Sequence, residues 1–408
     1  MFCVVLHLFI FNSPAFLSEA RVFISPCFFK GAFNLKRLFI STLGVALIVL
    51  LAPVSGAWAG QTITVPNGQT VMHFVCGNGD TADFGNSPCD SALTVGNTVT
   101  IDSGGAVQSA VFGVSGAYND TDANGVTGNQ VTVNGKVDDG VVEGGDHDRD
   151  GTADDVTASG NTVTVGSGAV VTGGITGGYA VTYSGNATAS DNTVQINGGT
   201  ISRNIIGGSA ERYSSTGTAI ATATGNTVTI QGSPTFVGVI RLWGGDGGTP
   251  GTNNTLNLHV AGLSVVNLRY FQKLNFELPA SLGKGGTMIT ATNMADITDV
   301  TGADISIAVS PGSLLKVGDE IVLIDVGQPA ELRVNGALTV GTAITSLTPG
   351  YTFDVVSVAG QLVVKLTGAP SRASTSTSVP ALNEMMLILL ALLLAGTAMV
   401  KRNRSVKK

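Results

Sequence analysis

Along the middle of the chain, apolar and polar residues alternate in short runs that recur at nearly fixed intervals. One run, Gly96–Ile101, reads Gly-Asn-Thr-Val-Thr-Ile, so Val99 and Ile101 share one face of an extended segment and the threonines share the other. The pattern predicts a β-strand at the same place in each repeat. The asparagines of this run and of five related runs stand at positions 97, 129, 161, 192, 226 and 254, which are 28 to 34 residues apart.

A pair of small residues marks the middle of each repeat. One repeat cannot bury its own apolar row, whereas copies stacked strand on strand can. We therefore predict an all-β fold, a right-handed parallel β-helix of about five coils of 28–34 residues over residues 96–258, with the asparagine amides stacked between coils. Each repeat should extrude a loop, mainly after the small pair. The pairs are Ser115-Gly116, Gly144-Gly145, Gly177-Gly178, Gly207-Gly208 and Gly244-Gly245.

Both ends of such a solenoid need a cap, because bare ends are open sheet edges. Residues 60–95 are the predicted N-terminal cap and contain Cys76 and Cys89. In a secreted chain these cysteines most simply form a disulfide, with two free thiols as the alternative. Residues 259–368 show longer β patterns and are the predicted β-rich C-terminal cap.

The repeats also resemble a known class of surface proteins. Their Gly-Asn-Thr-Val-Thr-Ile runs, the segment Leu268–Pro279 and the segment Gly286–Ala291 are similar to passenger regions of large β-helical autotransporter adhesins. The resemblance implies a β-helical rod that presents loops for adhesion at a bacterial surface.

Residues 1–59 are interpreted as a leader and signal peptide. Basic residues at Lys30, Lys36 and Arg37 precede an apolar run that ends in the small-x-small sequence Ala57-Trp58-Ala59. Cleavage is expected between Ala59 and Gly60. The hydrophobic stretch before this signal suggests an over-long start, and the alternative is an N-terminal anchor that the mature protein keeps.

The C-terminal segment is interpreted as a second sorting element. A Ser/Thr-rich linker at 369–378 leads to residues 379–408, where an apolar stretch at 385–400 is long enough for a minimal transmembrane helix and a basic cluster follows. The segment resembles the IPTL-CTERM sorting domain of Gram-negative bacteria, a relative of PEP-CTERM signals, which begins Ile-Pro-Thr-Leu-Ser-Glu-Trp. The resemblance implies a transient hold in the inner membrane and processing by an exosortase-like enzyme, whereas a plain tail anchor is the alternative. The matching positions are Val379, Pro380, Leu382 and Glu384.

Charge narrows the choice of partners. Residues 60–369 carry 11 Lys and Arg against 26 Asp and Glu, which gives 11 − 26 = −15. Such a surface repels nucleic acid and anionic lipid, and it favours cations. We therefore expect no nucleic-acid partner.

Two acidic segments carry the pattern of a calcium loop. In the first, carboxylates alternate and a glycine turn follows, so that oxygens can surround a hard cation. A weaker copy lies one repeat earlier. Calcium is therefore the predicted cofactor, and a solvated acidic loop is the alternative for both segments. The expected ligands are Asp146, Asp148, Asp150, Thr152, Asp154 and Asp155 in the first segment and Asp120, Asp122 and Asn124 in the second.

No catalytic residues are predicted. The histidines of the body, His73, His147 and His259, stand in no nucleophile motif. We expect a non-catalytic secreted surface protein, adhesin-like or associated with a biofilm matrix, that binds a glycan or a protein and resides at the outer cell surface or in the extracellular matrix. A polysaccharide lyase or hydrolase is the alternative, and it requires an Asp/Glu pair and a basic residue in one open groove. A calcium-dependent spacer without a ligand is the third possibility.

Overall fold

The asparagine-containing runs form parallel strands that pair in register. In a computed structural model of the chain, strand β11 (Gln130–Val133) pairs with β6 (Thr98–Ile101) on one side and with β16 (Thr162–Val165) on the other, so that Val131 lies opposite Val99 and Val163. The structure describes residues 6–7, 23–24, 60–79, 89, 93–109, 112–120, 125–149, 151–214, 218–248, 251–292, 297–327, 332–334, 338–358 and 360–370. The predicted parallel β-helix repeat is confirmed.

The chain divides into the units Met1–Trp58 and Ala59–Lys408. In the first unit, the described residues form one antiparallel pair, β1 (Leu6–His7) with β2 (Phe23–Ile24). No helix within the described ranges is long and apolar enough to span a membrane. The predicted cleavage residue Ala59, the sorting motif at 379–384 and the predicted helix at 385–400 lie outside those ranges.

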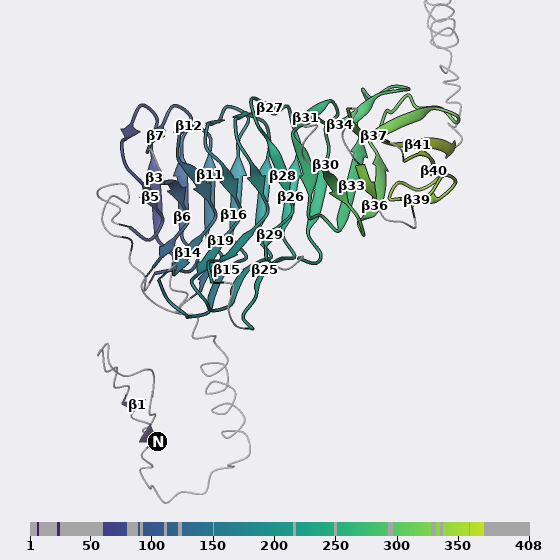
Figure 1. Ribbon diagram of the computed structural model, residues 1–408. Coiled ribbons are helices and arrows are strands. Elements are labelled where there is room, and N and C mark those ends of the chain that lie inside the picture. Colours follow the sequence, from purple (N-terminus) through teal and green to yellow (C-terminus); the bar gives the residue numbers. More distant parts are fainter. Residues whose placement is uncertain are drawn as a thin grey trace, which may run out of the picture. The chain divides into compact units, whose positions relative to one another are not determined.

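A long sheet runs along the solenoid and ends in an antiparallel closing region (Figure 1). Successive coils contribute one strand each from β3 to β36, and β39, β40, β41 and β37 then pair antiparallel. The remaining strands of this sheet are β3 (Thr62–Val65), β21 (Thr193–Ile196), β26 (Thr227–Ile230), β30 (Thr255–Leu258), β33 (Lys273–Leu278), β36 (Asp304–Val309), β39 (Ala343–Ser346), β40 (Thr352–Ser357), β41 (Gln361–Gly368), β37 (Glu320–Val326), β34 (Thr287–Ala291) and β31 (Leu263–Val265).

Two further parallel sheets complete the wall of the main coil. One has six strands, β4 (Thr70–Val71), β7 (Ala106–Gln108), β12 (Lys136–Asp138), β17 (Val170–Val171), β22 (Thr200–Ile201) and β27 (Thr235–Phe236). The other has nine strands, β5 (Val75–Cys76), β8 (Phe112–Ser115), β13 (Val141–Glu143), β18 (Ile175–Thr176), β23 (Ile205–Ile206), β28 (Arg241–Trp243), β32 (Asn267–Arg269), β35 (Thr298–Val300) and β38 (Leu332–Val334).

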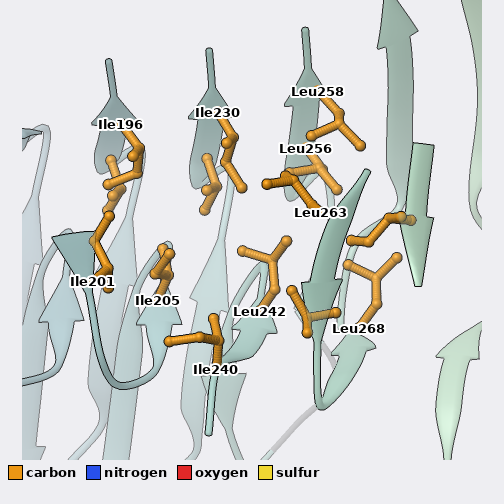
Figure 2. Packing of buried hydrophobic residues seen from close by; sticks show 14 of the residues in the cluster. Ile196, Ile201, Ile205, Ile230, Ile240, Leu242, Leu256, Leu258, Leu263 and Leu268 are labelled. Carbon is orange, nitrogen blue, oxygen red and sulfur yellow. The ribbon is translucent and has the colours of Figure 1, made fainter. Parts of the chain in front are cut away.

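The solenoid makes about eight turns, so the predicted count of about five coils is too low. The physical reason is that the rows of buried apolar side chains continue in coils beyond the last asparagine of the ladder. Leu274 and Phe276 of β33 continue the rows of Leu256 and Leu258, and all four side chains are buried. Figure 2 shows such rows from neighbouring coils meeting inside the solenoid. Burial of apolar side chains, rather than the asparagine, is therefore what a coil requires here.

The asparagines form a buried ladder, as predicted. The Nδ2 of Asn161 donates to the Oδ1 of Asn192, 3.1 Å away, and to the carbonyl oxygen of Val126 at 3.0 Å. All six ladder asparagines are fully buried. At the last rung the backbone N–H of Asn254 donates to the Oε1 of Gln272, so a glutamine ends the ladder.

The residue before each ladder asparagine adopts the left-handed conformation. Gly160, for example, has φ of 63°. Glycine adopts this conformation without a steric penalty, and the two exceptions, Asp191 and Asn253, belong to the residue types that tolerate it best. The Gly-Asn pair of the repeat thus combines a required backbone turn with a required amide.

A side lobe replaces the loops that were predicted after the small pairs. It consists of a five-stranded and a four-stranded parallel sheet with a separate alanine-rich core, in which Ala189 and Ala210 are buried. The loop prediction is wrong here, because short alternating Ala/Thr/Ser runs pair in register with their copies. The strands are β9 (Tyr118–Asn119), β14 (Asp146–Arg149), β19 (Tyr179–Thr182), β24 (Ser209–Arg212) and β29 (Asp246–Gly247) in one sheet and β10 (Val126–Thr127), β15 (Val156–Ser159), β20 (Ala187–Ser190) and β25 (Ala221–Thr224) in the other.

Candidate functional site: an acidic face on the side lobe

The small pair allows the chain to bend from the main coil into the side lobe. A Cβ atom added at Gly178 would lie 2.6–2.7 Å from the amide atoms of Asn192, and one added at Gly208 would lie 2.6–2.8 Å from those of Asn226. The amide leaves little room for a side chain at this position, although Ala117 occupies it in an earlier coil. Glycine is required one residue earlier, where a Cβ atom added at Gly177 would clash with the carbonyl oxygen of Gly207. The two features that recur in the sequence, the ladder asparagine and the small pair, therefore contact each other.

Two rows of side chains flank this bend. The β13 residue Glu143 lies opposite Thr176 of β18, and beyond the glycine pair Asp146 lies opposite Tyr179 of β19. Farther along the second row, Ser209 lies opposite Asp246. We call the five carboxylates in this region the acidic face, defined as Glu143, Asp146, Asp148, Glu211 and Asp246.

At one end of the acidic face, two carboxyl groups share a buried position. Glu143 and Asp146 are hydrogen-bonded to each other, and their exposed fractions are 7% and 1%. Burial raises the pKa of Glu143 to about 7, an effect that the hydrogen bond from Asp146 opposes and the charge of Asp148 reinforces. Burial and the charge of Glu143 also raise the pKa of Asp146. The pair therefore holds a proton near neutral pH, because two adjacent buried carboxylates repel each other.

Strand alternation separates this acidic row from the alanine core. His147 lies between Asp146 and Asp148, is fully buried, and accepts a hydrogen bond at Nδ1 from the backbone N–H of Thr157 at 3.0 Å. Its register neighbour on β19 is Ala180, a member of the alanine core. The carboxylates consequently point away from that core. The Oδ1 atom of Asp146 is buried there and has no hydrogen-bond partner among the residues that the structure describes.

At the other end, the acidic face is open to solvent. Partial burial, followed by the charge of Asp246, raises the pKa of Glu211, while a hydrogen bond with Tyr179 lowers it. Burial likewise raises the pKa of Asp246. Burial and then the charge of Glu211 raise the pKa of Tyr179, so this phenol stays protonated. The face thus changes from a closed, protonated pair at Glu143 to accessible carboxylates at Glu211.

An open cavity of about 660 Å³ lies at this accessible end. Strand β29 pairs with β24 only at Ser209 and Ala210, so Glu211 and Arg212 pair with β19 on one side and have no β29 partner on the other. In the four-stranded sheet, β25 is the last strand in the described part of the chain. The lining includes Glu211, Arg212, Tyr213, Ile220 and Asp246. The cavity therefore exists because the side lobe stops while the main coil continues.

The residues of the predicted first calcium segment lie in several environments. Asp146 and Asp148 belong to strand β14 and not to a loop. The carboxylate of Asp154 forms an ion pair with Arg149. The Oδ1 of Asp155 accepts from the backbone N–H of Asn186 at 2.7 Å, and this contact lowers the pKa of Asp155.

Of the other predicted ligands, Thr152 and Asp120 lie within the described residues. The Oγ1 of Thr152 donates to the carbonyl oxygen of Arg149 at 3.2 Å, and Asp120 lies close enough to Asp146 to raise the pKa of Asp146. Asp122, Asn124 and Asp150 are outside the described residues. Within the described ranges, no group of three or more His, Cys, Asp or Glu residues is arranged to hold a metal ion.

The predicted disulfide is confirmed. Cys76 and Cys89 are bonded, with Cα atoms 6.3 Å apart and a sequence separation of 13. Cys76 is the last residue of β5, in the first described coil of the solenoid. The bond therefore ties Cys89 to that coil.

Sequence reasoning missed Glu143, Glu211, Asp246 and the tyrosines as members of one site. They belong to three repeats, and none of them is in a motif. A usable signal was their proximity to the glycine pairs: Glu143 directly precedes one pair, Asp246 directly follows another, and Glu211 lies three residues after a third. Comparison with known proteins adds no relative, since no family model, no curated protein and no solved structure matches the chain.

Proposed function

We propose that the chain is a non-catalytic secreted surface protein, adhesin-like or associated with a biofilm matrix, whose side lobe binds a surface ligand. The observation that supports this best is the open cavity at the end of the side lobe, where Tyr213 is 59% exposed beside Glu211 and Asp246. Exposed aromatic rings next to hydrogen-bonding groups are the usual composition of a binding site. A stack of hydrogen-bonded coils holds these side chains on a rigid support.

The test is a binding assay with fluorescently labelled, purified chain on bacterial cells and on isolated extracellular matrix. The proposal predicts saturable binding that an excess of unlabelled chain displaces. Binding should also fall at high salt, because the site is charged. Absence of saturable binding to both cells and matrix would contradict the proposed function.

The proposed route to the surface uses the two termini. Residues 1–59 would direct secretion with cleavage between Ala59 and Gly60, residues 385–400 would hold the precursor in the inner membrane, and an exosortase-like enzyme would then process the segment 379–408. Mass spectrometry of both ends of the protein recovered from cells tests this route. The expected mature N-terminus is Gly60, and mature material that retains Lys408 would contradict processing at the C-terminus.

Calcium stays a proposed cofactor. Its support is the carboxylate-rich stretch from Asp146 to Asp155 and the negative body charge. Titration calorimetry with calcium chloride tests it, and no heat above dilution at millimolar calcium would reject it.

A polysaccharide lyase or hydrolase is the second candidate, because of one observation. The Glu143–Asp146 pair contains a carboxyl group whose pKa of about 7 suits a general acid. The two groups are hydrogen-bonded, whereas glycosidase carboxyl groups are roughly 5 to 9.5 Å apart, and both are buried from a polymer. Incubation with a panel of polysaccharides tests this candidate. New reducing or unsaturated ends that Glu143→Gln abolishes would favour the enzyme.

A further inference from the structure

We propose that the cavity at the end of the side lobe binds an unacetylated amino sugar of a surface or matrix glycan. This inference rests on the proposed function, since it names the ligand class of the same site. The cavity volume of about 660 Å³ falls within the range of small-ligand pockets. The ligand class follows from four side chains: Glu211, Asp246, Arg212 and Tyr213.

The carboxylates of the cavity favour a positively charged ligand group. Glu211 and Asp246 are close enough for the charge of Asp246 to raise the pKa of Glu211, and Asp148 acts on Glu211 in the same direction. An ammonium group placed between these carboxylates would relieve their repulsion and form charge-assisted hydrogen bonds. The remainder of the acidic body attracts the same charge from a distance.

Arg212 favours an amino sugar over a simple cation as the ligand of the cavity. Neighbouring side chains of a strand point to opposite faces of its sheet, so Arg212 and Glu211 leave β24 on different faces, and both residues line the open cavity at the end of the lobe. Arg212 is partly exposed, and its buried Nη1 atom has no hydrogen-bond partner among the described residues, so the guanidinium keeps donor capacity for a bound acceptor. Sugar hydroxyl and ring oxygens supply such acceptors, whereas a lysine side chain or a metal ion supplies none.

The apolar part of the cavity suits a pyranose ring. Tyr213 and Ile220 are 59% and 52% exposed, and both line the cavity. An aromatic ring can cover the apolar face of a sugar and also attract a nearby ammonium group. One cavity thus offers carboxylates, a guanidinium donor and an apolar wall, which together match a sugar that carries an amine.

Titration calorimetry with the β-1,4-linked glucosamine trimer tests the proposal, and its N-acetylated counterpart is the matched neutral ligand. The wild-type chain should bind the glucosamine trimer at least tenfold more tightly than the acetylated trimer. Glu211→Gln and Asp246→Asn should each weaken that binding at least tenfold, whereas Glu320→Gln, at an exposed position of β37, should leave it unchanged. Circular dichroism should show the same β-sheet spectrum for all variants.

The outcomes separate this proposal from the proposed function. Equal affinity for the two trimers, or unchanged affinity in folded Glu211→Gln and Asp246→Asn, would overturn the amino-sugar site. If the chain binds cells or matrix but not the glucosamine trimer, the amino-sugar site fails and the surface function stands. If it binds the trimer through Glu211 but neither cells nor matrix, the site stands and the surface function fails.

Discussion

The Oδ1 atom of Asn161 accepts two hydrogen bonds from Asn129 in the preceding coil, one from its backbone N–H and one from its Nδ2, each 3.0 Å long. The Nδ2 of Asn129 also donates to the carbonyl oxygen of Thr94 at 2.9 Å. Each buried amide is therefore an acceptor for one coil and a donor to another. An aspartate could not replace it, because the carboxylate has no hydrogen to donate.

Loss of one rung should destabilise the solenoid. Asn161→Ala leaves the backbone N–H and Nδ2 of Asn129 without their buried acceptor, and each unsatisfied buried group costs roughly 1–3 kcal/mol. We expect a decrease of about 2–4 kcal/mol in the free energy of unfolding, measured by urea titration. Thr164→Ser, on the partly exposed face of β16, is the control and should change it by no more than about 0.5 kcal/mol. A similar free energy of unfolding for both variants would contradict a stabilising role of the asparagine ladder.

The small pair should be as sensitive as the amide that it contacts. In Gly177→Ala, the new Cβ would clash with the carbonyl oxygen of Gly207 and lie 3.0 Å from the Cβ of Asn192, so the backbone must move. We expect a loss of about 1–3 kcal/mol in unfolding free energy. Gly283→Ala is the matched control, since a Cβ there has no neighbour within 4 Å. Equal stability of the two variants would show that the neighbouring coil does not confine Gly177.

Much of the main coil could be predicted from the sequence, and the side lobe could not. Val131 and Val133 alternate with polar residues at a fixed place in each repeat, and this pattern specifies both a strand and its register. Ala187 and Ala189 alternate too, but with side chains so small that the run is hard to tell from a loop. Their burial depends on identical runs in adjacent coils, which only the folded stack supplies.

The pair Glu143–Asp146 should make stability fall as the pH rises. Burial raises the pKa of Glu143 from 4.5 to about 7 in the folded state. Below pH 4.5 the group is protonated in both states, so it has no effect there. Between pH 4.5 and 7 the unfolded chain releases the proton that the folded chain keeps, so the free energy of unfolding decreases, and above pH 7 the full penalty remains.

Glu143→Gln isolates this contribution, because glutamine keeps the shape and does not titrate. Urea titrations from pH 4 to about pH 8 should show a smaller decrease in stability for the variant than for the wild type, with the variant more stable at the upper end. Identical pH profiles would mean that the pair does not hold a proton in the folded protein.

The disulfide should contribute to the stability of the first coil. Replacing both Cys76 and Cys89 by serine opens a closed loop of 13 residues, and a loop of this size is worth about 3 kcal/mol. Hydrogen exchange followed by mass spectrometry should show faster exchange in β3, β4 and β5 of the variant. Exchange in β20 and β21, several coils away, should be unchanged. Uniform acceleration along the solenoid would contradict a local role.

The acidic face was hidden from sequence reasoning for a physical reason. Asp146 and Asp148 are two residues apart in a conspicuous acidic segment, and that spacing suggested a metal loop. In the structure the same alternation places both on one side of strand β14, where Glu143 is a hydrogen-bond partner of Asp146. Glu211 and Asp246 join this face only because successive repeats wind back to the same position.

The register of neighbouring coils tests the central claim most directly. Thr132 lies opposite Thr164, and Thr164 lies opposite Gln195 one coil farther on. Adjacent strands are about 4.8 Å apart, a distance that a disulfide can span. Strands two coils apart are about twice as far from each other, which is too far for a disulfide. Under oxidation, peptide mass spectrometry should detect a crosslink in Thr132→Cys/Thr164→Cys and none in Thr132→Cys/Gln195→Cys. A crosslink in the second variant, or in neither, would contradict the stacked-coil structure.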